Sequence, residues 1–323
     1  MVSLTTSPND SPNKKAVVLQ ATLVVPVLNA QAWLPTLLPC LAQLVNRGDY
    51  QCLIIDSAST DATKVLCHAY PQLEFLSIAR REFDHGGTRN LALTYAKADI
   101  VVYLSQDALP TLESVQLLVS KLQSQPDLAA AYGRQLPHAK AQAFGAHLRA
   151  FNYPPHSYIS SPATLKERGI KAAFLSNAFC AYNIKALNAV GQFPDNTIIG
   201  EDFIVGAKFL AAGYSLAYVA KATAIHSHDY TPLQELKRYF DIGCMHRQEA
   251  WIFTRLARPE KAGRQYVISE WRWLINQGKV FKIPESIVRT LLKWLGYKLG
   301  KYSHYLPKSL NKALSMNKNW WNK

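Results

Sequence analysis

Apolar and polar blocks alternate along the first third of the chain and predict strands and helices in turn. The first block (AVVLQATLVVPVLN) is too apolar for a half-exposed strand and predicts a β-strand buried on both faces. The expected strands are residues 16–29, 52–55, 73–78 and 100–104. The expected helices cover residues 32–45, a stretch ending near residue 69, and residues 88–96. This alternation is typical of a mostly parallel, doubly wound α/β sheet.

Polar residues gather where these expected strands end. Pro26 and Asn29 close the first strand, Asp56 and Asp61 follow the second, and Asp107 follows the fourth. Ligands of such sheets bind beyond the carboxyl ends of the strands, so we expect the three acids to lie at one site. Each acid alone is ordinary, because Asp is also a favoured N-cap of the helix that follows.

Beyond residue 110 the pattern is less regular. A strand is expected near residues 128–132, and residues 136–169 show little periodicity, which predicts a long loop or lid with short helices. Further ordered segments are expected at residues 111–123, 174–184, 200–212 and 215–225. From residue 233 onward the whole pattern is helical.

The positive charge lies mainly in that helical part. The chain has 323 residues and a net charge of +14, yet residues 258–323 alone hold 14 Lys and Arg against three acids. Six of the seven tryptophans also lie at or beyond Trp251. With 49% hydrophobic residues the chain is not expected to be disordered as a whole. A nearly neutral body with a basic appendage suits nucleic acid, anionic lipid or a phosphorylated substrate as partner.

The remaining composition points to the cytoplasm. The five cysteines are scattered without metal-binding spacing, which favours a reducing compartment. Residues 1–15 are polar, without the apolar core of a signal peptide, and are expected to be disordered. No stretch reaches the roughly 18 apolar residues that span a bilayer. We therefore expect a cytoplasmic protein, either free or attached to a membrane surface.

Six motifs occur in order along residues 21–230, and together they resemble the family 2 inverting glycosyltransferases of the GT-A fold. The motifs are VVPVLN, DSASTDAT (Asp56 to Thr63), FDHGGTRN (Phe83 to Asn90), SQDA (Ser105 to Ala108), GEDF (Gly200 to Phe203) and the final HSH. HGGTRN with SQDA is similar to bacterial rhamnosyltransferases that use dTDP-L-rhamnose to build O-antigen or other surface polysaccharide. The resemblance implies a GT-A catalytic domain over residues 16–232, with a Rossmann-like sheet, and a helical basic region over residues 233–323.

The resemblance also implies which residues hold the nucleotide sugar. It places Pro26, Asp56 and Ser57 around the base and ribose, although many relatives carry a second Asp where Ser57 stands. Arg89 follows the Gly86–Gly87 pair, and a guanidinium on a flexible glycine loop suits a phosphate. The alternative is a surface arginine at the start of a helix. Gly86 and Gly87 are expected to let the backbone approach the donor closely.

For the leaving diphosphate, relatives hold Mg²⁺ or Mn²⁺ with an Asp-x-Asp at the fourth strand. This chain has Ser105-Gln106-Asp107 there, so Asp107 is the one carboxylate left for the metal, and Gln106 is expected on the donor side. His226 and His228 point the same way if the strand is extended, and either could complete the metal site.

For the base, the resemblance points to Asp202. The family uses the Asp of its Glu-Asp motif to take the proton of the acceptor hydroxyl, which inverts the anomeric carbon. The alternative is that Glu201 and Asp202 merely favour the N-terminus of the helix they open. The acceptor is expected to be a polysaccharide or a lipid-linked saccharide, and the sequence predicts no particular oligomeric state.

Residues 284–301 form an amphipathic helix whose apolar stripe has to be covered. It could pack on the catalytic domain, or lie in the inner membrane surface with Trp and Tyr at the headgroups and Lys on anionic lipid. We favour peripheral attachment to the cytoplasmic face of the inner membrane, because the resemblance implies lipid-linked acceptors there. Other functions stay open at this point. One is a glycosyltransferase that uses a UDP-hexose. Another is a nucleotidyltransferase of the same fold, although no Gly-rich phosphate loop follows the first strand. The third is a nucleic-acid-binding protein, although no nucleic-acid motif is present.

Overall fold

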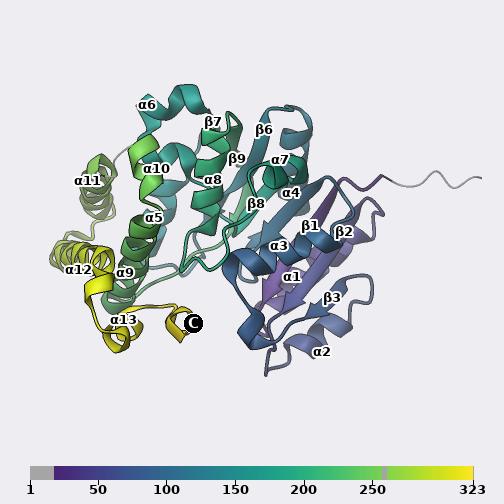
Figure 1. Cartoon of the computed structure of the whole chain (residues 1–323), viewed down its shortest axis with the longest axis horizontal. Helices are drawn as coiled ribbons and strands as arrows, with labels where there is room; N and C mark the ends of the chain where they lie inside the picture. Colours follow the sequence, from purple (N-terminus) through teal and green to yellow (C-terminus); the bar gives the residue numbers. More distant parts are fainter. Residues whose placement is uncertain (1–17, 257–259, 323) are drawn as a thin grey trace, which may run out of the picture.

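The first half of the computed structural model, which describes residues 18–256 and 260–322, is a parallel α/β layer. Its strands are β1 (Ala21–Val27), β2 (Tyr50–Asp56), β3 (Glu74–Ser77) and β4 (Ile100–Leu104). Between them run α1 (Leu34–Val45), α2 (Thr63–His68) and α3 (His85–Tyr95). The four strands are parallel, as the alternating pattern predicts, and lie in the order β3-β2-β1-β4 (Figure 1). The expected disordered residues 1–15 lie outside the described part of the chain.

The second half makes the sheet mixed rather than mostly parallel. Its strands are β5 (Leu109–Pro110), β6 (Leu128–Leu136), β7 (Tyr158–Ser160), β8 (Phe179–Asn183) and β9 (Ser215–Ile225). β8 runs antiparallel between β4 and β6, while β6 and β9 are parallel to each other. The order along the sheet is β3-β2-β1-β4-β8-β6-β9-β5, with β7 paired to β9. Helices α4 (Leu112–Gln123), α7 (Ile184–Ala189) and α8 (Glu201–Ala211) belong to this half.

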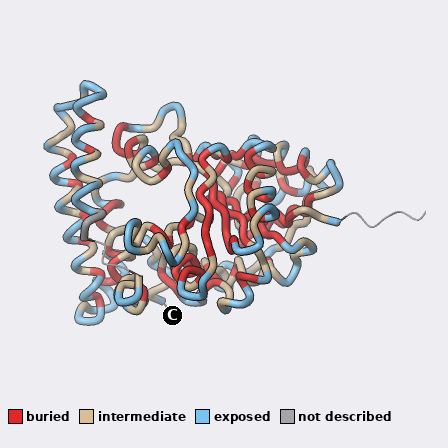
Figure 2. Tube along the Cα trace, turned by 90° about the horizontal axis from the view of Figure 1, so that it is seen from above, coloured by how far each residue is buried: buried red, intermediate tan, exposed pale blue. Residues whose placement is uncertain are grey.

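Apolar side chains cover both faces of the sheet. Leu23 and Val25 of β1 belong to one buried cluster, while Val24 between them belongs to the other. Successive strand residues point to opposite faces, so a strand covered on both sides must be apolar throughout. Figure 2 shows the strands as a buried band inside exposed helices. The continuous apolar run of the sequence is thereby explained.

Of two expectations about local structure, one was confirmed in part and one was wrong. Residues 136–169 contain the expected short helices, α5 (Ala143–Asn152) and α6 (Leu165–Arg168), but also the short strand β7. Helix α3 begins at His85 rather than at residue 88, because Asp84 caps it by accepting hydrogen bonds from the backbone nitrogens of Gly86 and Gly87. The two glycines therefore lie in the first turn of a helix and not in a loop.

The C-terminal part is helical, as predicted. It comprises α9 (Pro232–Gln248), α10 (Ala250–Arg255), α11 (Glu260–Asn276), α12 (Ile283–Lys301) and α13 (Lys308–Leu314). Short 3₁₀ turns in the chain are Arg80–Glu82, Pro162–Thr164, Gly169–Ala173, Val280–Lys282, Ser303–Tyr305 and Lys318–Asn322. α12 packs closely along α9, since an added Cβ at Gly296 or Gly300 would lie within 2.2 Å of a backbone oxygen of α9. In the described part of the chain, no helix is both long and apolar enough to cross a bilayer.

Helix α12 buries charged side chains and exposes apolar ones. Its charged residues Arg289 and Lys293 are only 5% and 8% exposed, and both contact Glu235 of α9 at 3.2 and 3.3 Å. Its apolar residues Ile287, Val288, Leu291, Trp294 and Leu295 are 41–61% exposed. We call these five residues the outward stripe. Of the two alternatives for the apolar side of this helix, packing on the protein does not apply to these five residues, because small and paired charged residues occupy the inner face.

Candidate active site

The loop after β2 is held by its own polar residues. Asp56 is 3% exposed, and its carboxylate accepts hydrogen bonds from the backbone nitrogen of Ser59 at 3.2 Å and from the Ser59 hydroxyl. Asp61 accepts from the backbone nitrogens of Thr63 at 3.0 Å and Gln31 at 3.1 Å. The N-cap of α2 is Ala62, so Asp56 does not cap that helix. Asp61 does accept a hydrogen bond from the first turn of α2.

The other residues expected around the nucleotide, Pro26, Ser57 and Gln106, differ in burial and in hydrogen bonding. Pro26 is half-buried in β1, one residue before that strand ends. Ser57 is fully buried, and among the described residues its hydroxyl has no hydrogen-bond partner. Gln106 accepts from the backbone nitrogen of Leu28 at 2.8 Å and donates to the oxygen of Leu28 at 3.1 Å. Gln106 therefore ties the end of β4 to the end of β1.

Three expected metal ligands come together at the edge of the sheet. Asp107 follows β4, and His226 and His228 follow β9. The Nε2 atoms of both histidines lie 3.5 Å from the carboxylate oxygens of Asp107. One ligand atom from each of the three residues falls within 4.8 Å of the others. Both histidines therefore lie beside Asp107, in a group of side chains that could hold a metal ion.

The chemistry of His226 fits a divalent cation. Its Nδ1 lies 2.8 Å from Oε1 of Gln135, an oxygen that can only accept, so we assign the imidazole proton to Nδ1. Its Nε2 then has a free lone pair, and this buried atom has no hydrogen-bond partner in the described part of the chain. A metal-binding histidine characteristically donates its other nitrogen to a neighbouring oxygen in this way.

The protonation of the cluster also favours a cation. Burial opposes ionisation of Asp107, but its polar surroundings, His226 first among them, hold the pKa of its carboxyl well below the usual value. Burial, reinforced by the neighbouring His226, lowers the pKa of His228 to about 4. One ionised carboxylate and neutral imidazole at physiological pH are ligands that Mg²⁺ or Mn²⁺ can accept.

The expected base lies at the start of α8. Gly200 has a left-handed φ of 81° and lets the chain turn into this helix. The carboxylate of Asp202 accepts hydrogen bonds from the backbone nitrogens of Phe203 at 2.8 Å and Asn177 at 3.1 Å. Burial and the negative charge of Glu201 raise the pKa of Asp202 to about 6. Asp202 is thus ionised at neutral pH, yet a better proton acceptor than an ordinary aspartate.

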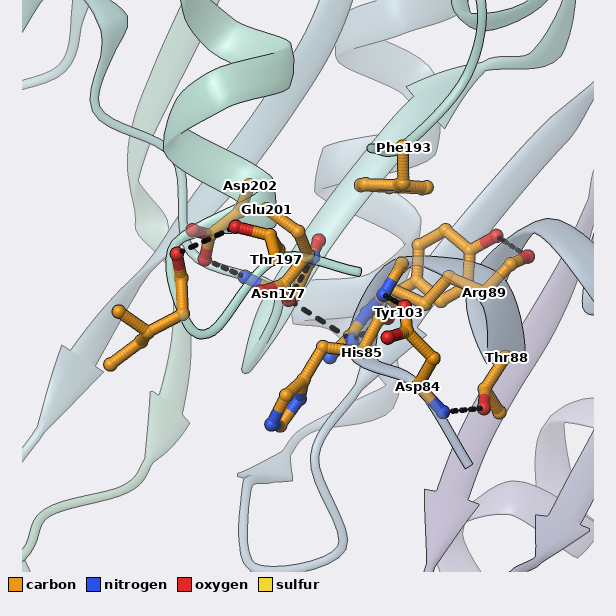
Figure 3. A network of polar contacts seen from close by, with 12 residues as sticks. Asp84, His85, Thr88, Arg89, Tyr103, Asn177, Phe193, Thr197, Glu201 and Asp202 are labelled. Carbon is orange, nitrogen blue, oxygen red and sulfur yellow. Dashed lines mark hydrogen bonds and ion pairs between the residues drawn. The ribbon is translucent and has the colours of Figure 1, made fainter. Parts of the chain in front are cut away.

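Glu201 is engaged in a buried network instead (Figure 3). Its Oε1 lies 3.0 Å from Nη1 of Arg89 and accepts a hydrogen bond from Nδ2 of Asn177 at 3.1 Å. Oδ1 of Asn177 accepts in turn from the hydroxyl of Tyr182 at 2.7 Å. Although burial opposes ionisation, Arg89 holds the pKa of Glu201 below its usual value. Glu201 supports the fold beside the base, as the sequence interpretation allowed.

Arg89 and Gly86 do not occupy the places expected for them. Arg89 lies in the first turns of α3, is largely buried, and donates to the oxygen of His85 at 2.6 Å besides pairing with Glu201. Arg89 was expected on a loop, where its guanidinium could bind a phosphate. That expectation was wrong, because α3 begins earlier and the guanidinium pairs with Glu201. A Cβ at Gly86 would lie 2.0 Å from the backbone oxygen of Pro194. The close approach that Gly86 allows is therefore to Pro194.

One short segment joins the Asp107 cluster to Asp202. Nε2 of Gln135, whose oxygen faces His226, donates to the hydroxyl of Ser176 at 2.8 Å. The next residue, Asn177, holds both Asp202 and Glu201. Residues 176–178 also reach the end of β4, where the backbone nitrogen of Ser105 donates to the backbone oxygen of Ala178 at 3.2 Å. The two centres are therefore fixed relative to each other.

Sequence reasoning missed Gln135 and the Ser176–Asn177 pair. All three are polar residues within or beside apolar runs, namely AAAYGRQL and FLSNAF. Gln135 is 1% exposed and Asn177 3% exposed, so each is a buried polar residue that requires partners. A polar residue that interrupts an apolar run was the sequence signal that could have identified these residues.

Comparisons with known proteins show the family and the fold of this chain. The model of the family described as glycosyl transferase family 2 matches residues 22–191. The O-antigen chain rhamnosyltransferase RfbN of Salmonella typhimurium is 39% identical over 306 residues, which cover 94% of this chain and 96% of the relative. TarS 1–349 of S. aureus has a TM-score of 0.55 at 16% identity, covering 92% of this chain and 83% of its own. The mannosyltransferase PcManGT from Pyrobaculum calidifontis, solved with GDP-Man and Mn²⁺, has a TM-score of 0.53 at 18% identity, covering 95% and 88%.

Proposed function

The chain belongs to glycosyl transferase family 2 and has its GT-A α/β fold, and from this premise we propose that it is a rhamnosyltransferase. The proposed donor is dTDP-L-rhamnose, and the proposed acceptor is a hydroxyl of a lipid-linked saccharide or polysaccharide. The assignment of rhamnose as the transferred sugar rests on the relative that is 39% identical over nearly the whole chain. Family membership favours glycosyl transfer over the nucleic-acid-binding and nucleotidyltransferase alternatives.

The observation that carries the reaction is the joining of the Asp107 cluster to Asp202 through residues 176–178. Transfer from a nucleotide sugar needs stabilisation of the leaving diphosphate and removal of a proton from the attacking hydroxyl. A cation site and a carboxylate with a raised pKa meet these two needs. Holding them in fixed relation lets both act on one anomeric carbon.

In the proposed reaction, Asp202 accepts the proton of the acceptor hydroxyl. The hydroxyl oxygen forms a bond to the anomeric carbon while the bond from that carbon to the diphosphate oxygen breaks. The bonding electron pair leaves with the diphosphate, and the configuration inverts. Backbone nitrogens of Asn177 and Phe203 orient the carboxylate, and Glu201 and Arg89 set its charge environment.

Asp107, His226 and His228 would hold Mg²⁺ or Mn²⁺. Such a cation supplies electrostatic stabilisation of the charge that develops on the diphosphate. Gln135 orients His226, and Gln106 braces the β4 end against β1 on the donor side. Pro26, Asp56 and Ser57 shape the nucleotide loop in this proposal, while Arg89 and Gly86 act within the fold.

The test is a panel of nucleotide sugars with the purified full-length protein and Mg²⁺ or Mn²⁺. We expect metal-dependent stabilisation and slow donor hydrolysis with dTDP-L-rhamnose and weaker effects with UDP-hexoses. Asp202→Asn should still bind the donor but lose about 10²- to 10⁴-fold in transfer, the usual contribution of a general base. Asp107→Ala should abolish the metal dependence. A clear metal-dependent signal from a UDP-sugar with none from dTDP-L-rhamnose would replace the rhamnosyl proposal by transfer of a hexose.

We also propose that residues 233–323 attach the enzyme peripherally to the cytoplasmic face of the inner membrane. The outward stripe of α12 exposes Trp294 and four aliphatic side chains, and α11 adds the exposed Ile268, Trp271 and Ile275. Exposed basic residues accompany them, including Arg272, Lys298 and Lys301. Apolar, tryptophan and basic side chains together suit the interface of an anionic bilayer.

Vesicle flotation tests this attachment directly. Leu291→Ser/Trp294→Ser should reduce binding to vesicles that contain phosphatidylglycerol, because the transfer free energy of two side chains is lost. Val65→Ser, a change of an even more exposed apolar residue on α2, serves as the control. Equal binding of wild type and both variants would contradict the assignment of the outward stripe to lipid.

A further inference from the structure

A cavity of about 710 Å³ lies between the turn that follows β3 and the C-terminal segment. Its lining carries the cations Arg80, Arg81 and Lys318, together with His85, Asn317 and Trp320. Resting on the proposed function, we propose that this cavity binds the phosphate or diphosphate group of a lipid-linked acceptor. None of the residues placed on the donor side of the reaction lines it.

The charge of the cavity favours an anion. Three permanently charged cations lie in its lining, and Asp84 is the one carboxylate among the described residues there. Oδ1 of Asp84 already accepts hydrogen bonds from the backbone nitrogens of Gly86 and Gly87 at 3.1 and 3.0 Å. Arginine presents paired donors that match phosphate oxygens, and Asn317 and its neighbour Asn319 add amides.

The C-terminal wall of the cavity is fixed in place. Asp241 is fully buried, and its Oδ2 accepts from the backbone nitrogens of Met316 at 3.0 Å and Asn317 at 3.4 Å. Nε1 of Trp320 donates to the oxygen of Asn196 at 2.9 Å. Nδ2 of Asn317 donates to the oxygen of Ile198 at 3.0 Å. The wall is thus attached to the segment that leads directly into the base motif.

The cavity also lies beside the proposed base. Thr197 and Ile198 line it and precede Asp202 by only a few residues. On its other side, the backbone oxygen of His85 accepts from Arg89, whose guanidinium contacts Glu201 (Figure 3). The metal cluster marks the side of the donor diphosphate, so a second anion-binding cavity next to the base fits an anionic group carried by the acceptor.

The experiment compares Arg81→Gln/Lys318→Gln with wild type and with Lys185→Gln, an exposed lysine outside the cavity. Each protein is assayed with dTDP-L-rhamnose and two acceptors, the same saccharide with and without a lipid-linked diphosphate. We expect the double variant to raise the KM for the diphosphate acceptor at least about tenfold, as loss of charge-assisted hydrogen bonds would. Its KM for the donor and for the phosphate-free saccharide should stay unchanged.

Other outcomes would overturn the inference. A raised KM for dTDP-L-rhamnose alone would assign the cavity to the donor, and equal effects on both acceptors would exclude phosphate recognition. Binding of inorganic diphosphate without metal, measured by calorimetry, gives a readout that does not depend on transfer. Wild type should bind it and the double variant should not. If wild type binds diphosphate but transfers no rhamnose, the proposed function fails while the cavity assignment stands.

Discussion

Two arginine–glutamate pairs, Arg89–Glu201 and Arg289–Glu235, are built alike and serve different ends. Both are short, at 3.0 and 3.2 Å, and both are largely buried. Each arginine also lies over an aromatic ring, Arg89 over Tyr103 and Arg289 over Phe144. The first pair joins α3 to α8 beside the proposed base, whereas the second joins α12 to α9 at the far end of the molecule.

The difference lies in what stands next to each pair. Glu201 is followed by Asp202, so its charge acts on a group that must exchange a proton. Arg289 and the neighbouring Lys293 both face Glu235, so their burial turns the apolar residues of α12 outward. The same chemical pair therefore sets an electrostatic environment in one place and the orientation of a helix in the other.

The largest effect is expected from Arg89→Met. This change leaves Glu201 buried with Asn177 as its remaining partner, and breaking one side of a buried pair costs about 3–5 kcal/mol. Urea unfolding measures the loss. Arg89→Met/Glu201→Gln should recover a large part of it, because the uncompensated charge is removed. A loss below about 1 kcal/mol in the single variant would show that the pair is not buried as described.

Arg289→Met should cost less, on the order of 1–3 kcal/mol, because Lys293 still neutralises Glu235. We expect weaker vesicle binding as well, since α12 loses part of what fixes its orientation. Transfer to a soluble acceptor by the folded protein should keep its kcat, which separates this pair from Arg89–Glu201. If kcat falls while vesicle binding is unchanged, the division of roles between the two pairs is wrong.

Glu201→Gln sharpens the comparison through pH rather than stability. Asp202 has to be ionised to accept a proton, so kcat/KM should rise with pH through about 6 in wild type. Removing the charge of Glu201 removes one cause of the raised pKa, so the acidic limb should move to lower pH. Arg89, then unopposed, lowers the pKa of Asp202 further in the same direction. Measured profiles that coincide would exclude Asp202 as the titrating base.

The sequence predicts the residues of the candidate site better than it predicts the buried pairs, and the reason is physical. Asp107, His226, His228 and Asp202 follow strand ends or open a helix, positions that local pattern identifies, and the structure brings the first three together. The pairing of Arg89 with Glu201 spans more than a hundred residues and depends on how α3 meets α8. The sequence therefore indicated the right motif but assigned its arginine to the ligand.

The inward turn of α12 was equally hidden. Its apolar residues have ordinary helical spacing, which predicts that they are covered but does not decide whether protein or lipid covers them. The charged face is turned toward α9 by Glu235, which attracts Arg289 and Lys293, and by glycines that allow close helix contact on that side. A single-helix pattern contains no information about a partner helix, so the exposed face could be found only in three dimensions.

The smallest effect is expected from Lys97→Ala, which tests whether burial or distance decides the strength of these pairs. Lys97 and Glu74 lie 2.7 Å apart, closer than either buried pair, but their side chains are 61% and 41% exposed. Water screens such a pair and the lysine loses conformational freedom to form it, so the free energy of unfolding should fall by at most about 1 kcal/mol. Urea unfolding in low and high salt measures both the loss and its screening. A loss comparable to that of Arg89→Met would mean that contact distance governs the three pairs, and the distinct roles of the two buried ones could then not be attributed to their surroundings.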